Sequence, residues 1–196
     1  MAERKSSPRK AAAVHPRFLY DLRHCGIRRA LDVVGEKWTL LVIREAVYGV
    51  RRFDDFARAL NCGRGILSAR LRTLTEQGVL EAREYAEPGH RTRNEYHLTE
   101  KGRDLFTAVL ALSQWSDRWM PPPDGPVAKV TLRRTGMPVV AVLASAPTVE
   151  RLTMDDIELA PGPGARLISG QPTHKQPIDK MTGAPRTPRA AKRPLR

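Results

Sequence analysis

Arginines interleaved with small residues over positions 64–72 are the feature of this sequence best suited to chemistry. Arginine binds guanine through two hydrogen bonds or binds a phosphate, and glycine lets a backbone come close to its ligand. Leucines recur there at three- and four-residue steps, so a helix would bury them and turn the other residues outward. We therefore predict a surface that reads double-stranded DNA, formed by Arg64, Gly65, Ser68 and Arg72.

Other basic residues extend this predicted surface. Arg52 precedes a short predicted helix and suits a phosphate contact, although a solvated basic corner would have the same sequence. His90 and Arg91 lie at the predicted tip of a β-hairpin, where we expect them to contact the DNA backbone or the minor groove. Arg70 could contact DNA or pair with a nearby acidic side chain, and we favour the ion pair.

Cys25 is the candidate for redox chemistry. It follows a histidine and has three arginines within four positions. A nearby cation lowers the pKa of a thiol and raises the thiolate fraction that redox sensing requires. A lone cysteine is usually just a small hydrophobe, so both interpretations stay open. Cys62 is predicted to belong to the turn before the 64–77 helix.

Motifs for catalysis and metal binding are missing from the sequence. It contains no GxSxG, phosphate-loop, HExxH or CxxC pattern, and its five histidines have no ligand spacing. Two cysteines 37 positions apart give neither a disulfide framework nor a zinc site. We predict that the protein is not an enzyme and uses no metal or other cofactor.

The apolar periodicity predicts the elements that would position these residues. Helices are expected over about 25–34, 37–48, 52–60 and 64–77, strands over 79–85 and 93–98, and a long last helix from Thr99. Two helices joined by a tight turn and followed by a β-hairpin form a winged helix-turn-helix, a mainly α fold with a small β wing. Trp115 and Trp119 of the last helix are expected in the core or at a dimer interface. The alternative is an effector pocket between this helix and the first.

The charge distribution indicates the domain organisation. Of a formal net charge of +13, residues 1–24 carry +4 and residues 171–196 carry +6. Such basic, proline-containing segments with few large apolar residues bury too little surface to fold. We predict a disordered basic arm over 1–16, a winged helix-turn-helix domain over 17–120, a linker and small β appendage over 121–170, and a disordered basic tail over 171–196. Within the appendage, strands are expected over 127–132 and 137–144, with a third candidate over 157–159.

Several blocks between about 25 and 120 closely resemble the HxlR-type winged helix-turn-helix regulators, a bacterial family of the MarR-like group. The blocks are Cys25-Gly26-Ile27, Gly35-Glu36-Lys37-Trp38-Thr39-Leu40-Leu41, Arg51-Arg52-Phe53, Leu67-Ser68-Ala69-Arg70-Leu71-Arg72-Thr73-Leu74 and Tyr96-His97-Leu98-Thr99-Glu100-Lys101-Gly102. The appendage resembles a C-terminal extension of some actinobacterial relatives, but it lacks their metal-spaced cysteines. The chain departs from the family pattern at Gly26, where proline is usual, and at Arg64-Gly65, where serine with proline or lysine is frequent.

The resemblance implies a homodimer formed through the first and last helices and bound to a palindromic operator. It also places Cys25 where many relatives sense electrophiles or oxidants, so that an oxidant or a small-molecule effector is a candidate partner. We therefore expect a sequence-specific transcriptional regulator, acting as a repressor, in the cytoplasm. No run of 18 apolar residues predicts a membrane span. The alternative is a general nucleic-acid-binding protein that uses its basic tails and has no sensing role.

Overall fold

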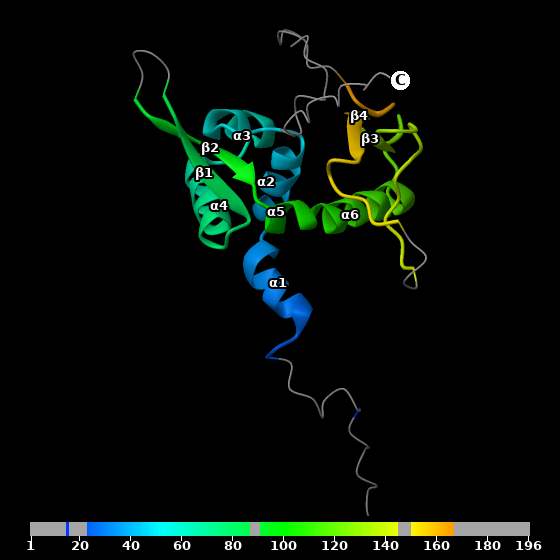
Figure 1. Ribbon diagram of the computed structural model, residues 1–196, viewed down its shortest axis with the longest axis horizontal. Helices are drawn as coiled ribbons and strands as arrows, with labels where there is room; N and C mark the ends of the chain where they lie inside the picture. The colour runs from blue at the N-terminus through cyan, green and yellow to red at the C-terminus, as the bar shows by residue number, and fades with distance from the viewer. Residues whose placement is uncertain (1–14, 16–22, 87–90, 145–149, 167–196) are drawn as a thin grey trace, which may run out of the picture.

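The computed structural model describes residues 15, 23–86, 91–144 and 150–166 (Figure 1). A helical body carries one β-hairpin on one side and a second, smaller hairpin on the other, which confirms the predicted mainly α winged helix-turn-helix with a small β appendage (Figure 1). In chain order the elements are α1 (Gly26–Val34), α2 (Lys37–Val47), α3 (Phe53–Leu60), α4 (Arg64–Glu76), β1 (Leu80–Tyr85), β2 (Arg93–Leu98), α5 (Glu100–Asp104), α6 (Phe106–Trp119), β3 (Ala128–Leu132) and β4 (Ile157–Pro161). Every described helix is too short or too polar to cross a bilayer.

The main core lies around α2, which packs against α3, α4, α6 and β2. The apolar residues of α2 and α4 recur at helical spacing, so each helix buries one face. Trp38 is partly buried against this core. The central buried side chains are Val42, Ile43, Phe56, Leu67, Leu71, Leu74, Val79 and Leu80.

The turn between α3 and α4 places these two helices as a helix-turn-helix. Asn61 ends α3 in the left-handed conformation with φ of 46°, a conformation that asparagine tolerates better than most residues. Gly63 then precedes α4. This tight reversal lets α4 lie across the core with its outer face exposed.

The wing is an antiparallel pair of β1 and β2, in register from Leu80 opposite Leu98 to Tyr85 opposite Arg93. Its base is fixed by Thr99, whose hydroxyl donates to the carbonyl oxygen of Gly78 at 2.6 Å and accepts from the amide of Gly102 at 3.1 Å. Thr99 is therefore the N-cap of α5. α4 also packs directly against β1, so the wing lies beside this helix (Figure 1).

Two features differ from the sequence predictions. The long last helix is divided at Leu105, whose amide bonds to the carbonyl oxygen of Gly102, three residues back. In the appendage, the predicted strand over 137–144 is wrong: β3 pairs with β4, the segment predicted only as a third candidate. The 137–144 stretch forms a single bridge, between Pro138 and Thr131, and two of its backbone groups bond to the side chain of Gln114. Several of its backbone groups thus find hydrogen-bond partners without a strand ladder.

Large apolar side chains are exposed on two helices of the body. On α1, Ile27 is 73% exposed and Leu31 is 57% exposed. On α6, Trp115 is 57% exposed and Trp119 is 63% exposed. The two tryptophans therefore lie outside the core of this chain. α1 itself stands out from the body (Figure 1).

Candidate nucleic-acid interface

The outer face of α4 brings together the predicted DNA-reading residues. The three leucines of α4 are buried, whereas Arg64, Gly65, Ser68 and Arg72 are exposed. A Cβ built on Gly65 would meet no other atom within 4 Å. Packing within the chain therefore does not require a glycine at this position, and the open space is on the outside of the helix.

The arginine that begins α4 is held in place by α3. The guanidinium of Arg64 lies 3.1 Å from a carboxylate oxygen of Asp54 and 4.7 Å from the ring centre of Phe53. The other oxygen of Asp54 is 3.5 Å from the guanidinium of Arg93 on the wing. One exposed carboxylate thus contacts the start of α4 and the wing together. These contacts are solvent-exposed. They orient the arginines but contribute little to the stability of the fold.

Arg52 connects α3 to the wing. Its Nε donates to Glu95 at 3.0 Å, and its guanidinium lies 4.3 Å from the ring centre of Tyr85. The hydrogen bond from Arg52 lowers the pKa of the Glu95 carboxyl. Burial lowers the pKa of the neighbouring His97, whose ring nitrogen lies 3.4 Å from Glu95. The side chain of Arg52 remains 44% exposed, so it can brace the wing and still face solvent.

The expected ion pair of α4 involves a different arginine. Arg72 lies 4.0 Å from Glu76 one turn later, and both side chains are exposed. Arg70 is half-buried and has no ion pair among the residues that the structure describes. A pair of this kind at i,i+4 is weak, so a phosphate or a base could replace Glu76 at Arg72.

The tip of the wing is described only in part. Arg91 is exposed near the start of β2. His90 lies outside the described residues, as do most of the predicted N-terminal arm and all of the predicted C-terminal tail. The wing therefore adds Arg91 and Arg93 to the exposed arginines of α4.

The two cysteines occupy different settings. Cys25 immediately precedes α1 and is half-buried. Cys62 lies in the turn before α4 and packs against the main core. Neither forms a disulfide bond.

Sequence reasoning missed the acidic and aromatic partners of the arginines. The sequence predictions give Asp54 no role, and they place Tyr85 and Glu95 only within the strands expected over 79–85 and 93–98. A signal was present for Asp54, since the helix-turn-helix geometry brings the first turn of one helix close to the start of the next. The contacts of Glu95 cross 43 positions and depend on how the wing folds back.

This geometry defines a winged helix-turn-helix DNA-binding protein: a second helix with an open, arginine-containing face lies beside a β wing. The model of the HxlR-like helix-turn-helix family matches residues 33–124. The uncharacterized HTH-type transcriptional regulator Rv3095 of Mycobacterium tuberculosis (strain ATCC 25618 / H37Rv) is 44% identical over 145 residues, which cover 73% of this chain and 90% of that protein. The chain belongs to the HxlR family of helix-turn-helix transcriptional regulators, which are not enzymes.

Other comparisons agree with this assignment. YvaP of Bacillus subtilis (strain 168), also an uncharacterized HTH-type transcriptional regulator, is 32% identical over 95 residues, covering 48% of this chain and 86% of that protein. The crystal structure of PA1607, described as a candidate transcription factor, superposes with a TM-score of 0.56 at 36% identity and covers 70% of this chain and 95% of that one. The 145-residue match to Rv3095 is too long to end at α6, so it extends into the β appendage.

Proposed function

We propose that this protein is a sequence-specific transcriptional repressor that binds a palindromic DNA operator as a homodimer in the cytoplasm. The observation that carries the proposal is the open face of α4. Gly65 has no packing reason to be glycine, and arginines flank the space in front of it. A major groove admits such a helix, and a glycine lets the helix backbone approach the DNA closely.

Each predicted contact residue then has a role. Arg64, Ser68 and Arg72 would meet base edges or phosphates in the major groove, and Gly65 would let the backbone approach. The wing would meet the adjacent minor groove or backbone through His90 and Arg91. Arg52 would contact a phosphate with the part of its side chain that Glu95 and Tyr85 leave exposed.

A homodimer would account for the apolar surface of α1 and α6. Monomeric proteins seldom expose large apolar side chains in groups. Burial of such a surface between two copies is favoured by about 25 cal/mol per Å². A two-fold dimer would also present two copies of α4 to successive major grooves, and this arrangement requires a palindromic site. The residues concerned are Ile27, Leu31, Leu112, Trp115 and Trp119.

Cys25 is the proposed site of redox or electrophile sensing. It is half-buried at the beginning of α1, the helix assigned to the dimer interface. Modification of its thiol would therefore alter the helix that joins the two copies. Replacement by serine keeps the size and removes the thiolate chemistry. We expect Cys25→Ser to retain operator binding but to lose release by diamide or a quinone, measured by gel shift, while Cys62→Ser keeps both. Release that is unchanged in Cys25→Ser would exclude Cys25 as the sensor.

A gel shift of the full chain tests the main proposal. The DNA upstream of its own gene is compared with random duplex of the same length and base composition. A sequence-specific regulator should prefer the upstream DNA by roughly 1,000-fold or more at physiological salt. Equal affinity for both DNAs would favour the alternative, a general nucleic-acid-binding protein that acts through its basic tails.

A further inference from the structure

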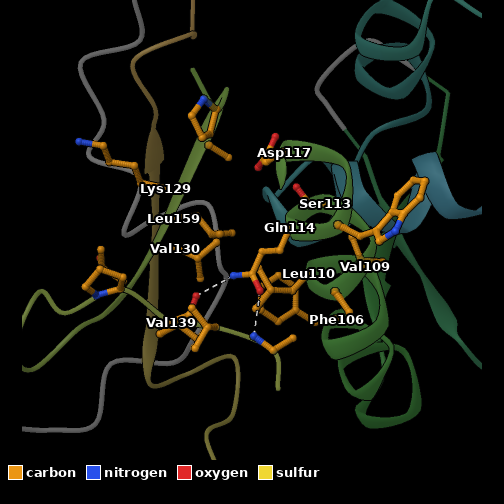
Figure 2. Close-up of a pocket in the computed structure, with 18 of the residues that line it drawn as sticks. Phe106, Val109, Leu110, Ser113, Gln114, Asp117, Lys129, Val130, Val139 and Leu159 are labelled. Atoms are coloured by element: carbon orange, nitrogen blue, oxygen red, sulfur yellow. Dashed lines mark hydrogen bonds between the residues drawn. The ribbon is translucent and has the colours of Figure 1, made fainter. Parts of the chain in front are cut away.

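A cavity of about 910 Å³ lies between α6 and the β3–β4 hairpin, beside α2 (Figure 2). This volume is within the range of small-molecule sites. Its walls are mostly apolar and come from separate elements. They include Val47 of α2, Phe106 and Leu110 of α6, Val130 of β3 and Leu159 of β4. The cavity is outside the predicted DNA-reading face, and Trp115 and Trp119, assigned above to the dimer surface, also line it.

One side of the cavity is closed by the extended segment 138–141, which α6 holds in place. Nε2 of Gln114 donates to the carbonyl oxygen of Val139 at 2.9 Å, and its Oε1 accepts from the amide of Ala141 at 2.9 Å (Figure 2). Both ends of the Gln114 amide are thereby satisfied. Gln114 is therefore a structural tie for the cavity wall and leaves the recognition of a ligand to other groups.

Several polar side chains that line the cavity make no hydrogen bond or ion pair within the described part of the chain. They include Tyr48, which directly follows α2, and Ser113 and Asp117 of α6, as well as Lys129 and Thr131 of β3. Burial raises the pKa of the Tyr48 phenol; the charge of Arg44 lowers it, and the charges of Glu45 and Asp117 raise it. Tyr48, Ser113 and Asp117 also line a second hollow on the other side of Tyr48. Polar groups that converge on an apolar cavity without internal partners are a feature of ligand sites.

The charged side chains around the cavity indicate the sign of the charge that a ligand would carry. The guanidinium of Arg44 is already paired with Glu45, its Nε lying 2.7 Å from the carboxylate. Arg118 lies over the ring of Trp119, 5.1 Å from its centre. The ammonium of Lys129 points away from α6, whereas Asp117 leaves α6 on the side of the hairpin (Figure 2). Asp117 is the one acidic side chain among the described lining residues, and no basic side chain pairs with its carboxylate.

We propose that this cavity binds a small organic cation, an amine with an aromatic or aliphatic body. The apolar body lies against Phe106, Leu110 and Val130, and the ammonium pairs with Asp117. The hydroxyl oxygens of Tyr48 and Ser113 accept hydrogen bonds from the other N–H groups of the amine. Both hydroxyls thereby gain a hydrogen-bond partner. The site adds a ligand to the proposed regulator, and its occupancy can be measured without DNA.

The experiment measures fluorescence anisotropy of two dyes with the full chain in the absence of DNA. Rhodamine 6G and fluorescein share a xanthene ring system, but the first is a cation and the second an anion at neutral pH. We expect saturable binding of rhodamine 6G and little binding of fluorescein. Equal binding of the two dyes would show a general apolar surface instead of a cation site and would overturn the proposal.

Variants locate the binding. Asp117→Asn should weaken rhodamine 6G by roughly tenfold or more, the value of one charge-assisted contact, and Tyr48→Phe by a smaller factor. Glu84→Gln, which removes an exposed carboxylate from the wing, is the matched control and should bind like the parent protein. If Asp117→Asn binds like Glu84→Gln while its circular dichroism is unchanged, the assignment is wrong. If Asp117→Asn is unfolded, the comparison of Tyr48→Phe with the parent protein decides in its place. Loss of operator preference in the gel shift would leave the dye result intact, so the two proposals fail independently.

Discussion

Two sets of exposed side chains, those on the outer face of α4 and the apolar ones of α1 and α6, differ in whether they already have partners. On α4, Arg64 lies against Asp54 and Phe53, and Arg72 lies near Glu76. These contacts are exposed and weak, so an anionic ligand can take over each arginine at low cost. On α1 and α6, the side chains of Leu31 and Trp115 are exposed to solvent. The arginines of α4 can exchange their partners within the chain for an anionic ligand. The apolar side chains of α1 and α6 are stabilised only when another apolar surface covers them.

The largest expected effect comes from the apolar surface. Trp115→Glu places a charge where two copies would meet, and burial of an unpaired charge is strongly unfavourable. We expect the variant to be a monomer by sedimentation velocity. Operator affinity should fall by roughly 100-fold or more, because linked half-sites bind with that much avidity.

The control for this change is Met137→Glu. Met137 is 64% exposed, as Trp115 is at 57%, but it lies in the appendage. It should leave both the oligomeric state and the operator affinity unchanged. A Trp115→Glu variant that remains a dimer would assign the α1–α6 surface to some other role.

The second effect concerns the open space at Gly65. Gly65→Leu places a side chain where no atom of the chain lies within 4 Å, so the protein should fold normally. The side chain would hold α4 away from the groove, and operator affinity should fall by roughly tenfold or more, the value of one lost base contact. Thermal unfolding and gel shift are measured together.

Gly65→Ala separates stability from binding at the same position. Alanine should raise the stability of the helix by up to about 1 kcal/mol, since glycine is the poorer helix former. Operator affinity should fall less than in Gly65→Leu. A Gly65→Leu protein that binds its operator with parent affinity would show that this face does not enter the groove.

The third effect compares two basic residues, Arg72 of α4 and Arg91 of the wing. Arg72→Ala should weaken the operator by about 1–3 kcal/mol and random DNA much less, as expected for a base contact. Arg91→Ala should weaken both DNAs about equally and reduce the log–log salt slope by roughly 0.9, as expected for a phosphate contact. Fluorescence anisotropy titrations over a range of salt concentrations measure both quantities. Equal losses for the two variants on both DNAs would reverse these assignments.

The sequence predicted the helix-turn-helix well because its signals are local. The leucine spacing of α4 and the cap at Thr99 each depend on neighbouring residues. The partners of Arg52 and Arg64 were not predictable in this way, since Glu95 and Asp54 approach them only after the chain folds. The β-branched stretch over 137–144 was misread because β propensity indicates extended backbone and does not say whether the hydrogen bonds go to a strand or to Gln114.

The tryptophans of α6 show a second reason why the sequence did not predict every part of the structure. Together with Val109 they belong to the apolar residues that recur at three- and four-residue steps along α6. Val109 packs against the core of this chain, but Trp115 and Trp119 are exposed. Apolar periodicity alone cannot say whether a stripe is covered by its own chain or by another one. The sequence therefore allowed either a core position or a dimer interface for Trp115 and Trp119. The structure excludes the core position, because both side chains are exposed.

The smallest expected effect tests the contact between α3 and the wing by pH. The hydrogen bond from Arg52 lowers the pKa of Glu95 below its ordinary value of 4.5. A carboxyl whose pKa is lowered in the folded protein contributes stability above its unfolded pKa, and this contribution is lost as the pH falls through the folded pKa. Below about pH 5, where unfolded histidine is already protonated, the parent protein should lose stability more steeply than Glu95→Gln. Urea unfolding from pH 5 to pH 3 measures the difference, and Glu84→Gln, on the exposed side of β1, should follow the parent protein. Identical pH slopes for the parent protein and Glu95→Gln would mean that the contact between Arg52 and Glu95 does not stabilise the wing.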